Sequence, residues 1–382
     1  MHTSDWHAGR IWKGIDRSSE LEAVLDDLAN FLQREHVELL LVSGDVFDNG
    51  APVAKAEKLV FGFFKRIGKA GTKSIVIAGN HDSPARVEAW GLLAEFVDVH
   101  ARGFPRRAAD GGVISFQSRD GDPVHVAVVP FAPSRLLVTA AELASSETQA
   151  RQRYADGFAA MVESLCGVFR AGSINLLMAH THLQGAVLSN SERQVHVGDD
   201  WAATPQVLPS TAHYVALGHI HRPQRIDAAA APAEYAGSAL QLDFGEIGQD
   251  KSFVFFDARP RQPVRVERVP YRGGRLLSSM TAMLSDLERD APALRDAGWL
   301  RVEVLLEQRI PDLNARIRRM LPNAVSVQEV LPGPVSTSDV IRTSGMSPSD
   351  AYRAYFEITH GRPADDALVD KLKSLYEEET RA

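Results

Sequence analysis

The chain has 382 residues, more than one ordinary domain of roughly 150 residues needs, and its 45% hydrophobic content excludes a disordered or collagen-like protein. A single cysteine, Cys166, excludes a disulfide framework, while the lack of a long apolar run and of a signal peptide at MHTSDWHAGR leads us to expect a cytoplasmic protein. The net charge of −7 argues against a broad basic surface for DNA, so a chain this acidic would need bound cations to act on phosphates.

The first part of the chain, to about residue 260, alternates short apolar runs with helical patterns. Apolar residues recur at helical spacing within 21–32 and 59–67. The runs are rich in leucine or β-branched residues, as buried strands are, and occupy residues 38–43, 74–78, 124–130, 173–179 and 213–217. This alternation predicts an α/β sandwich with a largely buried sheet.

Residues 265–335 have the pattern of a small, separate α/β unit. One helix face is predicted from Leu277, Met280, Met283, Leu284 and Leu287, and another from Leu313, Ile317, Met320 and Leu321. Strands are predicted at 300–306 and 324–331. The predicted order is therefore helix, strand, helix, strand.

The remainder of the chain forms a tail that begins with a Pro/Ser-rich connection at 332–339. Amphipathic helices are predicted at 349–359 and 365–380, each near the length below which an isolated helix is marginal in water. Their apolar stripes contain Tyr352, Tyr355 and Phe356, then Leu368, Val369, Leu372, Leu375 and Tyr376. The stripes either fold back on the small α/β unit or lie in the groove of a partner.

Polar side chains follow the predicted strands of the first part. Such strand ends are where open α/β sheets place their sites. Only four residues precede the first cluster, which indicates a short first strand or an internal start. The clusters are Asp5-Trp6-His7, Gly44-Asp45-Val46-Phe47-Asp48, Gly79-Asn80-His81-Asp82, His180 with His182, and Gly218-His219-Ile220-His221.

Each cluster alone is a weak signal, because a D-x-H triplet or a D-x-x-D turn often occurs by chance. Together they supply imidazole, carboxylate and amide groups, which suit Mn, Fe or Zn. The lack of cysteine ligands favours two catalytic metals over one structural zinc. Two such ions can hold a phosphodiester, provided that they share a carboxylate and that a proton donor stands nearby.

This series of motifs resembles the calcineurin-like metallophosphoesterases. Within that superfamily, the sequence resembles the SbcD family, the nuclease subunits of bacterial SbcCD complexes. The segments that carry this resemblance are HTSDWHAGR, SGDVFDNGAP, AGNHDSP, ALGHIHRPQ and EYAGSALQLDFGE. The resemblance implies a four-layer α/β/β/α sandwich at 1–260 that carries the nuclease, a small α/β capping domain at 265–335, and a helical segment at 340–382 that docks on an SbcC-type ATPase.

The resemblance also implies roles for single residues. Asp5, His7 and His221 would hold one metal, Asn80, His180 and His219 the other, and Asp45 would bridge both; the family's metal is typically Mn²⁺, with Mg²⁺ or another divalent ion as an alternative. His81 would be the general acid or stabilise the transition state. Asp48 stands where other branches carry a histidine, so we expect it to orient a water or a ligand imidazole. The spacing to Gly185 and Ala186 favours His180 over His182 as the ligand.

The implied function is a nuclease in DNA repair, recombination and replication, associated with the nucleoid, with 3′→5′ double-strand exonuclease and single-strand or hairpin endonuclease activity. A stand-alone phosphatase or cyclic-nucleotide phosphodiesterase would leave residues 265–382 without a purpose. A catalytically inactive scaffold between DNA and the ATPase would have no use for seven metal donors.

The segment 56–67 is more apolar than one buried helix face requires. Its apolar residues cover roughly 200° of the helix, about twice the usual stripe, and are Leu59, Val60, Phe61, Phe63, Phe64 and Ile67. The excess surface either packs under a neighbouring helix or faces a partner. Because the family uses helices here for a two-fold contact, we expect a homodimer through residues 54–97.

Overall fold

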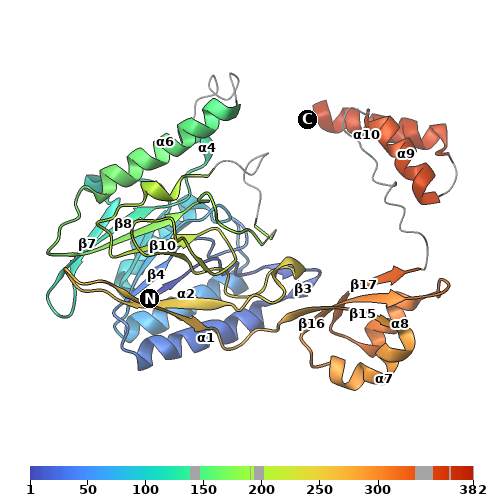
Figure 1. The fold of residues 1–382 in the computed structure, drawn as a ribbon, viewed down its shortest axis with the longest axis horizontal. Helices are drawn as coiled ribbons and strands as arrows, with labels where there is room; N and C mark the ends of the chain where they lie inside the picture. Colours follow the sequence, from blue (N-terminus) through green and yellow to red (C-terminus); the bar gives the residue numbers. More distant parts are fainter. Residues whose placement is uncertain (138–146, 190, 193–201, 332–346, 361–362, 382) are drawn as a thin grey trace. The chain divides into compact units, whose positions relative to one another are not determined.

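A computed structural model describes residues 1–137, 147–189, 191–192, 202–331, 347–360 and 363–381 (Figure 1). The chain divides into two compact units, one of Met1–Val304 with Pro311–Gln328, the other of Leu305–Ile310 with Glu329–Ala382. No helix in the described part of the chain is long and apolar enough to cross a bilayer.

Two six-stranded sheets form the centre of the first unit. The first sheet has the order β14 (Arg265–Pro270), β13 (Ser252–Asp257), β1 (His2–Thr3), β4 (Leu39–Val42), β5 (Lys73–Ile77) and β6 (Val99–Arg102). The second has the order β11 (Gln224–Arg225), β12 (Ala233–Tyr235), β10 (Tyr214–Gly218), β9 (Ile174–His180), β8 (Pro123–Val129) and β7 (Val113–Gln117). All five strands predicted for this part are confirmed as β4, β5, β8, β9 and β10.

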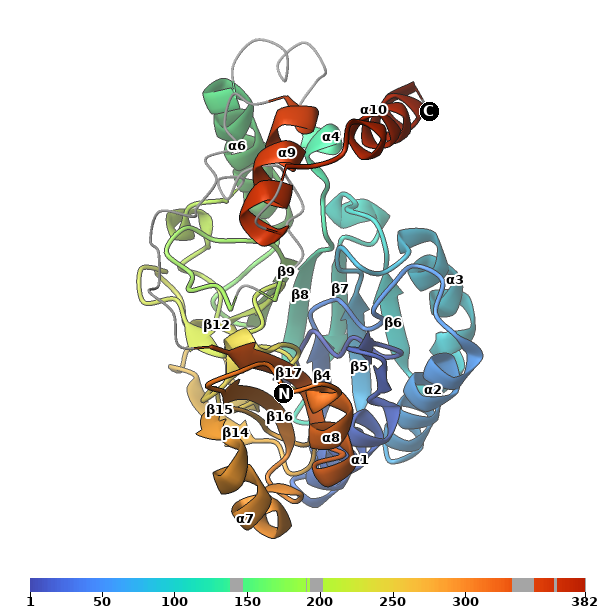
Figure 2. The ribbon, with the colours of Figure 1, turned by 90° about the vertical axis from the view of Figure 1, so that its right-hand side faces the viewer.

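Helices cover the outer face of each sheet (Figure 2). Leu40 and Val42 of β4 pack against the helices of the first sheet, whereas Leu41 between them packs against strands of the second sheet, as the alternation of a strand requires. The helices beside the first sheet are α1 (Ser18–Arg34), α2 (Ala54–Lys69) and α3 (Pro84–Ala94), and α4 (Ser134–Leu137) and α6 (Glu147–Cys166) lie by the second. The layers are therefore α/β/β/α, as predicted. Cys166 is buried in the core, as the apolar pattern around it indicates.

The small α/β unit differs from the prediction at its start. Residues Leu277–Met283 form a strand, β15, and the helix α7 begins only at Leu284 and ends at Leu294. The spacing of 277, 280, 284 and 287 fits a helix, but pairing with β16 (Trp299–Leu305) makes the first seven residues a strand with alternating exposure. β17 (Ala324–Val330) completes this sheet, and α8 spans Leu313–Met320. The division into 1–260, 265–335 and 340–382 stays a prediction.

The tail contains the two predicted helices, α9 (Pro348–His360) and α10 (Asp366–Arg381). They are joined by a hydrogen bond of 2.8 Å from Arg353 Nη2 to Asp366 Oδ1. Tyr355 is exposed, and the rings of Tyr352 and Phe356 lie 6.0 Å apart. The predicted connection at 332–339 and the side chains of Leu375 and Tyr376 lie outside the described residues. A short hairpin, β2 (Ile11–Trp12) and β3 (Ile15–Asp16), precedes α1, and 3₁₀ turns occupy Glu95–Val97, Ala108–Asp110, Pro205–Val207 and Phe244–Glu246.

Candidate metal centre

The polar clusters of the sequence meet at one end of the two sheets. β1, β4 and β5 are parallel, as are β9 and β10, so within each sheet the carboxyl ends share an edge. The backbone nitrogen of His219, from the second sheet, donates to Asp5 Oδ1 of the first at 3.1 Å. This edge carries Asp5 and His7 after β1, Asp45 after β4, Asn80 and His81 after β5, His180 at the end of β9, and His219 and His221 after β10.

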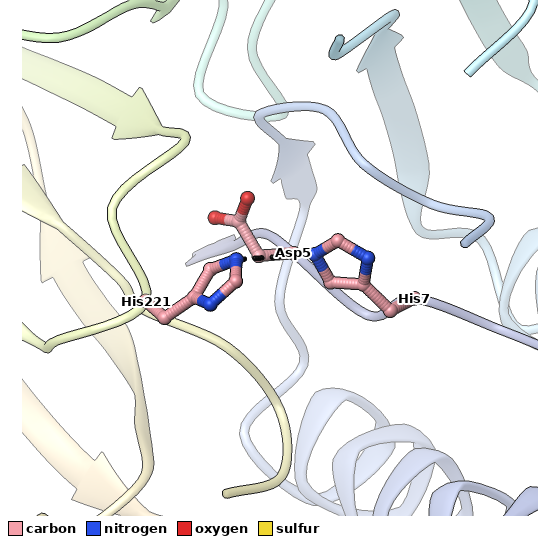
Figure 3. A group of neighbouring side chains, drawn as sticks. All are labelled: Asp5, His7 and His221. Carbon is pink, nitrogen blue, oxygen red and sulfur yellow. Dashed lines mark hydrogen bonds between the residues drawn. The ribbon is translucent and has the colours of Figure 1, made fainter. Parts of the chain in front are cut away.

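Asp5, His7 and His221 form one buried group (Figure 3). One possible ligand atom from each lies within 4.8 Å of the others. The two imidazoles face one another, with 3.2 Å between His7 Nε2 and His221 Nε2. The group is closed to solvent, since its residues are at most 2% exposed.

A second group forms around Asn80. Its Oδ1 lies 3.0 Å from His180 Nε2 and 2.8 Å from His219 Nδ1. Its Nδ2 is buried and has no hydrogen-bond partner in the described part of the chain. Asp5, Asp45 and His180 also have ligand atoms within 4.8 Å of one another, so this group adjoins the first.

Asp45 lies between the two groups. Its Oδ2 is 3.8 Å from His7 Nε2 and 3.6 Å from His180 Nε2, while its Oδ1 accepts a hydrogen bond of 2.8 Å from His81 N. Burial acts to raise the pKa of Asp45, but His180 and His7 outweigh it and lower that pKa to about 2. Burial and then the charge of Asp45 raise the pKa of Asp5 well above its ordinary value. Two buried carboxylates this close favour a cation between them.

The hydrogen bonds of the imidazoles test whether the residues fit a metal. His7 Nδ1 lies 3.2 Å from Asp48 Oδ1 and His221 Nδ1 lies 2.8 Å from Ser191 Oγ, so each ring has a partner for a proton on Nδ1. Two Nε2 lone pairs then face one another, which is repulsive unless a proton or a cation stands between them. Burial lowers the pKa of His7 to about 4, which disfavours a proton on its Nε2 near neutral pH. The residues therefore fit a bound cation.

The backbone at the centre is strained. Four residues have positive φ values, which residues other than glycine seldom adopt: 51° at Asp5, 48° at His7, 49° at Asp45 and 100° at His219. Such strain persists where the surrounding structure enforces it, typically at functional sites. The loops also pack so closely that a Cβ at Gly79 would lie 2.1 Å from Asp45 Oδ1, and one at Gly44 would lie 2.3 Å from His180 Nδ1.

His81 and Asp48 lie beside these groups, partly exposed. His81 Nδ1 is 2.8 Å from the carbonyl oxygen of Asp48, which leaves Nε2 as the nitrogen that can exchange a proton with a ligand. The His81 ring lies 4.6 Å from the ring of His7. Asp48 Oδ1 is shared by His7 Nδ1 and Arg10 Nη1, each at 3.2 Å.

Comparison with known proteins agrees with this geometry. Residues 1–223 match the family model described as calcineurin-like phosphoesterase. The chain belongs to this family. It is 29% identical to the SbcD component of nuclease SbcCD from Bacillus subtilis (strain 168) over 390 residues, which cover 97% of this chain and 96% of that protein. The corresponding SbcD proteins from Rhodobacter capsulatus and Escherichia coli (strain K12) are each 29% identical, covering 83% and 84% of this chain and 82% and 81% of theirs.

The phosphoesterase centre distinguishes between the two histidines that follow β9. His180 is buried, its Nδ1 lies 2.8 Å from the carbonyl oxygen of Ser43, and its Nε2 points to Asn80 and Asp45. His182 is only half-buried, and its ring lies 6.5 Å from that of His219. This arrangement agrees with the predicted preference for His180, although the ligand itself stays a prediction.

Two carboxylates that sequence analysis gave no role also shape this phosphoesterase centre. Buried Asp82 accepts hydrogen bonds from the backbone of Val46, Phe47 and Gly79 at 3.2, 2.9 and 2.9 Å, and so joins two of the loops. Burial and the charge of Asp45 raise the pKa of Asp82 to about 7. Buried Glu246 lies behind His221. The only sequence signals for them were the last letters of GNHD and EYAGSALQLDFGE.

Proposed function

We propose that this phosphoesterase is a metal-dependent DNA nuclease, the nuclease component of an SbcCD-type complex. The observation that carries the proposal is the gathering of two adjoining ligand groups around Asp45, in a chain that matches the relatives named as SbcCD nucleases along most of its length. Acting on chromosomal DNA, it would work at the nucleoid in the cytoplasm.

Asp5, His7 and His221 would hold one ion, Asn80, His180 and His219 the other, and Asp45 would contact both. We propose Mn²⁺, because a mixed set of imidazole, carboxylate and amide ligands suits a borderline divalent ion, with Mg²⁺ as the alternative. When bound, such a pair supplies Lewis acidity to the phosphoryl oxygens and makes an attacking water more acidic. The facing Nε2 atoms of His7 and His221 support this assignment.

His81 would supply the proton that the departing oxygen of the DNA strand takes up. Its position supports this role, because it is half-buried beside the ligand groups and its Nδ1 is held by the carbonyl of Asp48. The carboxylate of Asp48 would orient His7. These roles follow what general acid catalysis needs, namely a group close to the reacting atoms that is not itself consumed as a ligand.

The substrates would be duplex ends, cut as a 3′→5′ exonuclease, and single-stranded or hairpin DNA, cut as an endonuclease. An SbcC-type ATPase would bind residues 340–382. Exposure of Tyr355 and Leu368, 55% and 43%, supports a partner for these helices. Aromatic anchors of this kind carry much of the energy of an interface.

A homodimer through residues 54–97 is also part of the proposal. Most of the broad apolar arc of α2 is buried within the chain, including Phe64 at 5% exposure, but Phe61 is 40% exposed. Beside it is a hollow of about 390 Å³ whose lining includes Phe61, Phe64 and Trp90. Leu92 and Phe96 farther along are 78% and 85% exposed. An apolar surface of this kind supports a contact with a second copy.

The test is a nuclease assay with Mn²⁺ on linear duplex, hairpin and single-stranded DNA, set beside a small phosphodiester and a cyclic nucleotide. Cleavage of DNA in the presence of Mn²⁺, and its loss with a chelator, is the expected result. Activity confined to the small esters would favour a stand-alone phosphodiesterase instead. Metal binding without any hydrolysis would favour an inactive scaffold.

A further inference from the structure

The imidazole of His221 is held from behind by half-buried Ser191 and buried Glu246. Its Nδ1 lies 2.8 Å from Ser191 Oγ and 3.3 Å from Glu246 Oε1. The hydroxyl of Ser191 donates its own hydrogen to Glu246, so its oxygen is the acceptor for His221 Nδ1–H. The proton on Nδ1 is thereby fixed, and the lone pair of Nε2 is directed toward His7.

The charge of Glu246 is balanced by Lys251. Lys251 Nζ lies 2.6 Å from Glu246 Oε2 and donates to the carbonyl oxygen of His221 at 2.7 Å. Glu246 is 0% exposed and Lys251 8%. A buried ion pair contributes little net stability, because the loss of hydration offsets the attraction, but its directed hydrogen bonds fix the atoms that they join.

In the other group, His180 has a different partner behind its ring. His180 Nδ1 lies against a neutral carbonyl, that of Ser43. A carboxylate behind an imidazole makes it a stronger donor to a metal, and losing such a partner typically costs about 10–100-fold in metal affinity. His221 therefore has a support that His180 lacks.

We propose that Glu246 and Lys251 form a positioning pair for His221, which raises the affinity of the phosphoesterase for the cation held by Asp5, His7 and His221 but not for the other cation. This inference rests on the ligand assignment of the proposed function. Both residues act through His221, since Glu246 reaches its ring and Lys251 its backbone carbonyl.

The test measures Mn²⁺ binding to the full chain by calorimetry and by electron paramagnetic resonance, without any activity assay. The wild type should bind two ions with the spectrum of a coupled pair. Glu246→Gln keeps the shape of the side chain and removes its charge. In this variant we expect one affinity to fall about 10–100-fold, the other to stay unchanged, and the spectrum of isolated Mn²⁺ to replace that of the pair at limiting metal.

A double variant, Glu246→Gln with Lys251→Met, separates positioning from folding. Removing both charges leaves no unpaired buried ion, so the melting temperature of the metal-free protein should recover relative to Glu246→Gln. The weakened metal affinity should not recover, because the carboxylate behind His221 is still missing. Recovery of the affinity together with the melting temperature would overturn the proposal.

Glu234→Gln is the matched control. Glu234 is buried like Glu246 and lies 2.6 Å from Arg268 Nη2 through its Oε2, so this variant removes a buried, paired charge that belongs to Arg268 and not to His221. It should bind both ions with wild-type affinity. An equal loss of Mn²⁺ affinity in this control would show that removing any buried charge has the same effect, and it would overturn the proposal. Two unchanged affinities in Glu246→Gln would overturn the positioning role alone. A wild type that binds no pair of ions would overturn the proposed function, and the positioning role with it.

Discussion

At the scale of single residues, the centre is defined by acceptors that face one another. The Nε2 atoms of His7 and His221 are 3.2 Å apart, and Asn80 Oδ1 lies 3.0 Å from His180 Nε2. The sequence could predict which residues gather here, because each follows a strand in a short motif. It could not predict Asp82 or Glu246 as supports, since their importance lies in contacts that are made only after distant loops meet.

Asp45→Ala should remove both ions and all phosphodiesterase activity. Its Oδ2 lies within 4 Å of His7 Nε2 in one ligand group and of His180 Nε2 in the other. Among the described residues, no other carboxylate oxygen lies within 4 Å of both histidines. Metal content after dialysis, measured by mass spectrometry, checks this, with circular dichroism to confirm that the variant is folded. Full retention of one ion would refute the bridging role.

His81→Asn should behave in the opposite way. The variant keeps both ions and DNA binding, because the side chain of His81 is not one of the proposed ligands, while turnover falls by roughly 10²-fold or more, the scale of a positioned acid. Single-turnover rates and metal content measured on the same preparation decide the matter. Loss of metal in this variant would make His81 a ligand instead of an acid.

At the scale of elements, the periodicity of the sequence predicted the central strands of the two large sheets but not β6, β7, β13 or β14, nor the start of the small unit. The apolar residues at 277, 280, 284 and 287 satisfy a helix, and only pairing of 277–283 with β16 decides for a strand. The arc of α2 shows the same limit. The width of its apolar surface indicated a second contact. The sequence of one helix could not show whether a neighbouring helix or a partner makes that contact, because this depends on how the whole chain packs.

Phe61→Glu should give a folded monomer. Phe61 is 40% exposed, so a charge there would disturb a contact between copies more than the core of one copy. Phe64→Glu, which the sequence pattern made an equal candidate, should instead unfold the chain, because Phe64 is 5% exposed and packs in the core of the first sheet. Sedimentation velocity with thermal melts separates the two effects.

Lys58→Glu is the control for the Phe61 variant. Lys58 is exposed on the same helix but on the side toward α1, so this variant should remain dimeric. A Phe61→Glu profile equal to that of the wild type would contradict the dimer.

At the scale of the whole molecule, the same chain combines a centre fixed by buried contacts with a tail whose described side chains are mostly exposed or half-buried. The sandwich follows from the alternation of strands and helices, and its layers from apolar residues on both faces of each sheet. The alternation alone predicted an α/β sandwich, and the resemblance to the metallophosphoesterases implied its four layers. The use of the tail was not predictable in the same way, because amphipathic helices fit equally well on their own chain or on another.

Removing residues 340–382 should leave Mn²⁺-dependent nicking of single-stranded DNA intact, while co-purification with an SbcC-type ATPase and ATP-stimulated cutting of duplex ends are lost. The reason is that α9 and α10 pair with each other through Arg353 and Asp366 and expose Tyr355, whereas all the candidate ligands lie on strand ends between residues 5 and 221. The measurements are metal content, nicking rate and pull-down with the co-expressed ATPase.

Tyr355→Glu in the full chain is the finer variant and should weaken the same pull-down without altering the metal content. Unchanged ATPase binding by the truncated protein would refute the docking role, and loss of its metals or its fold would show that the tail instead supports the chain's own body.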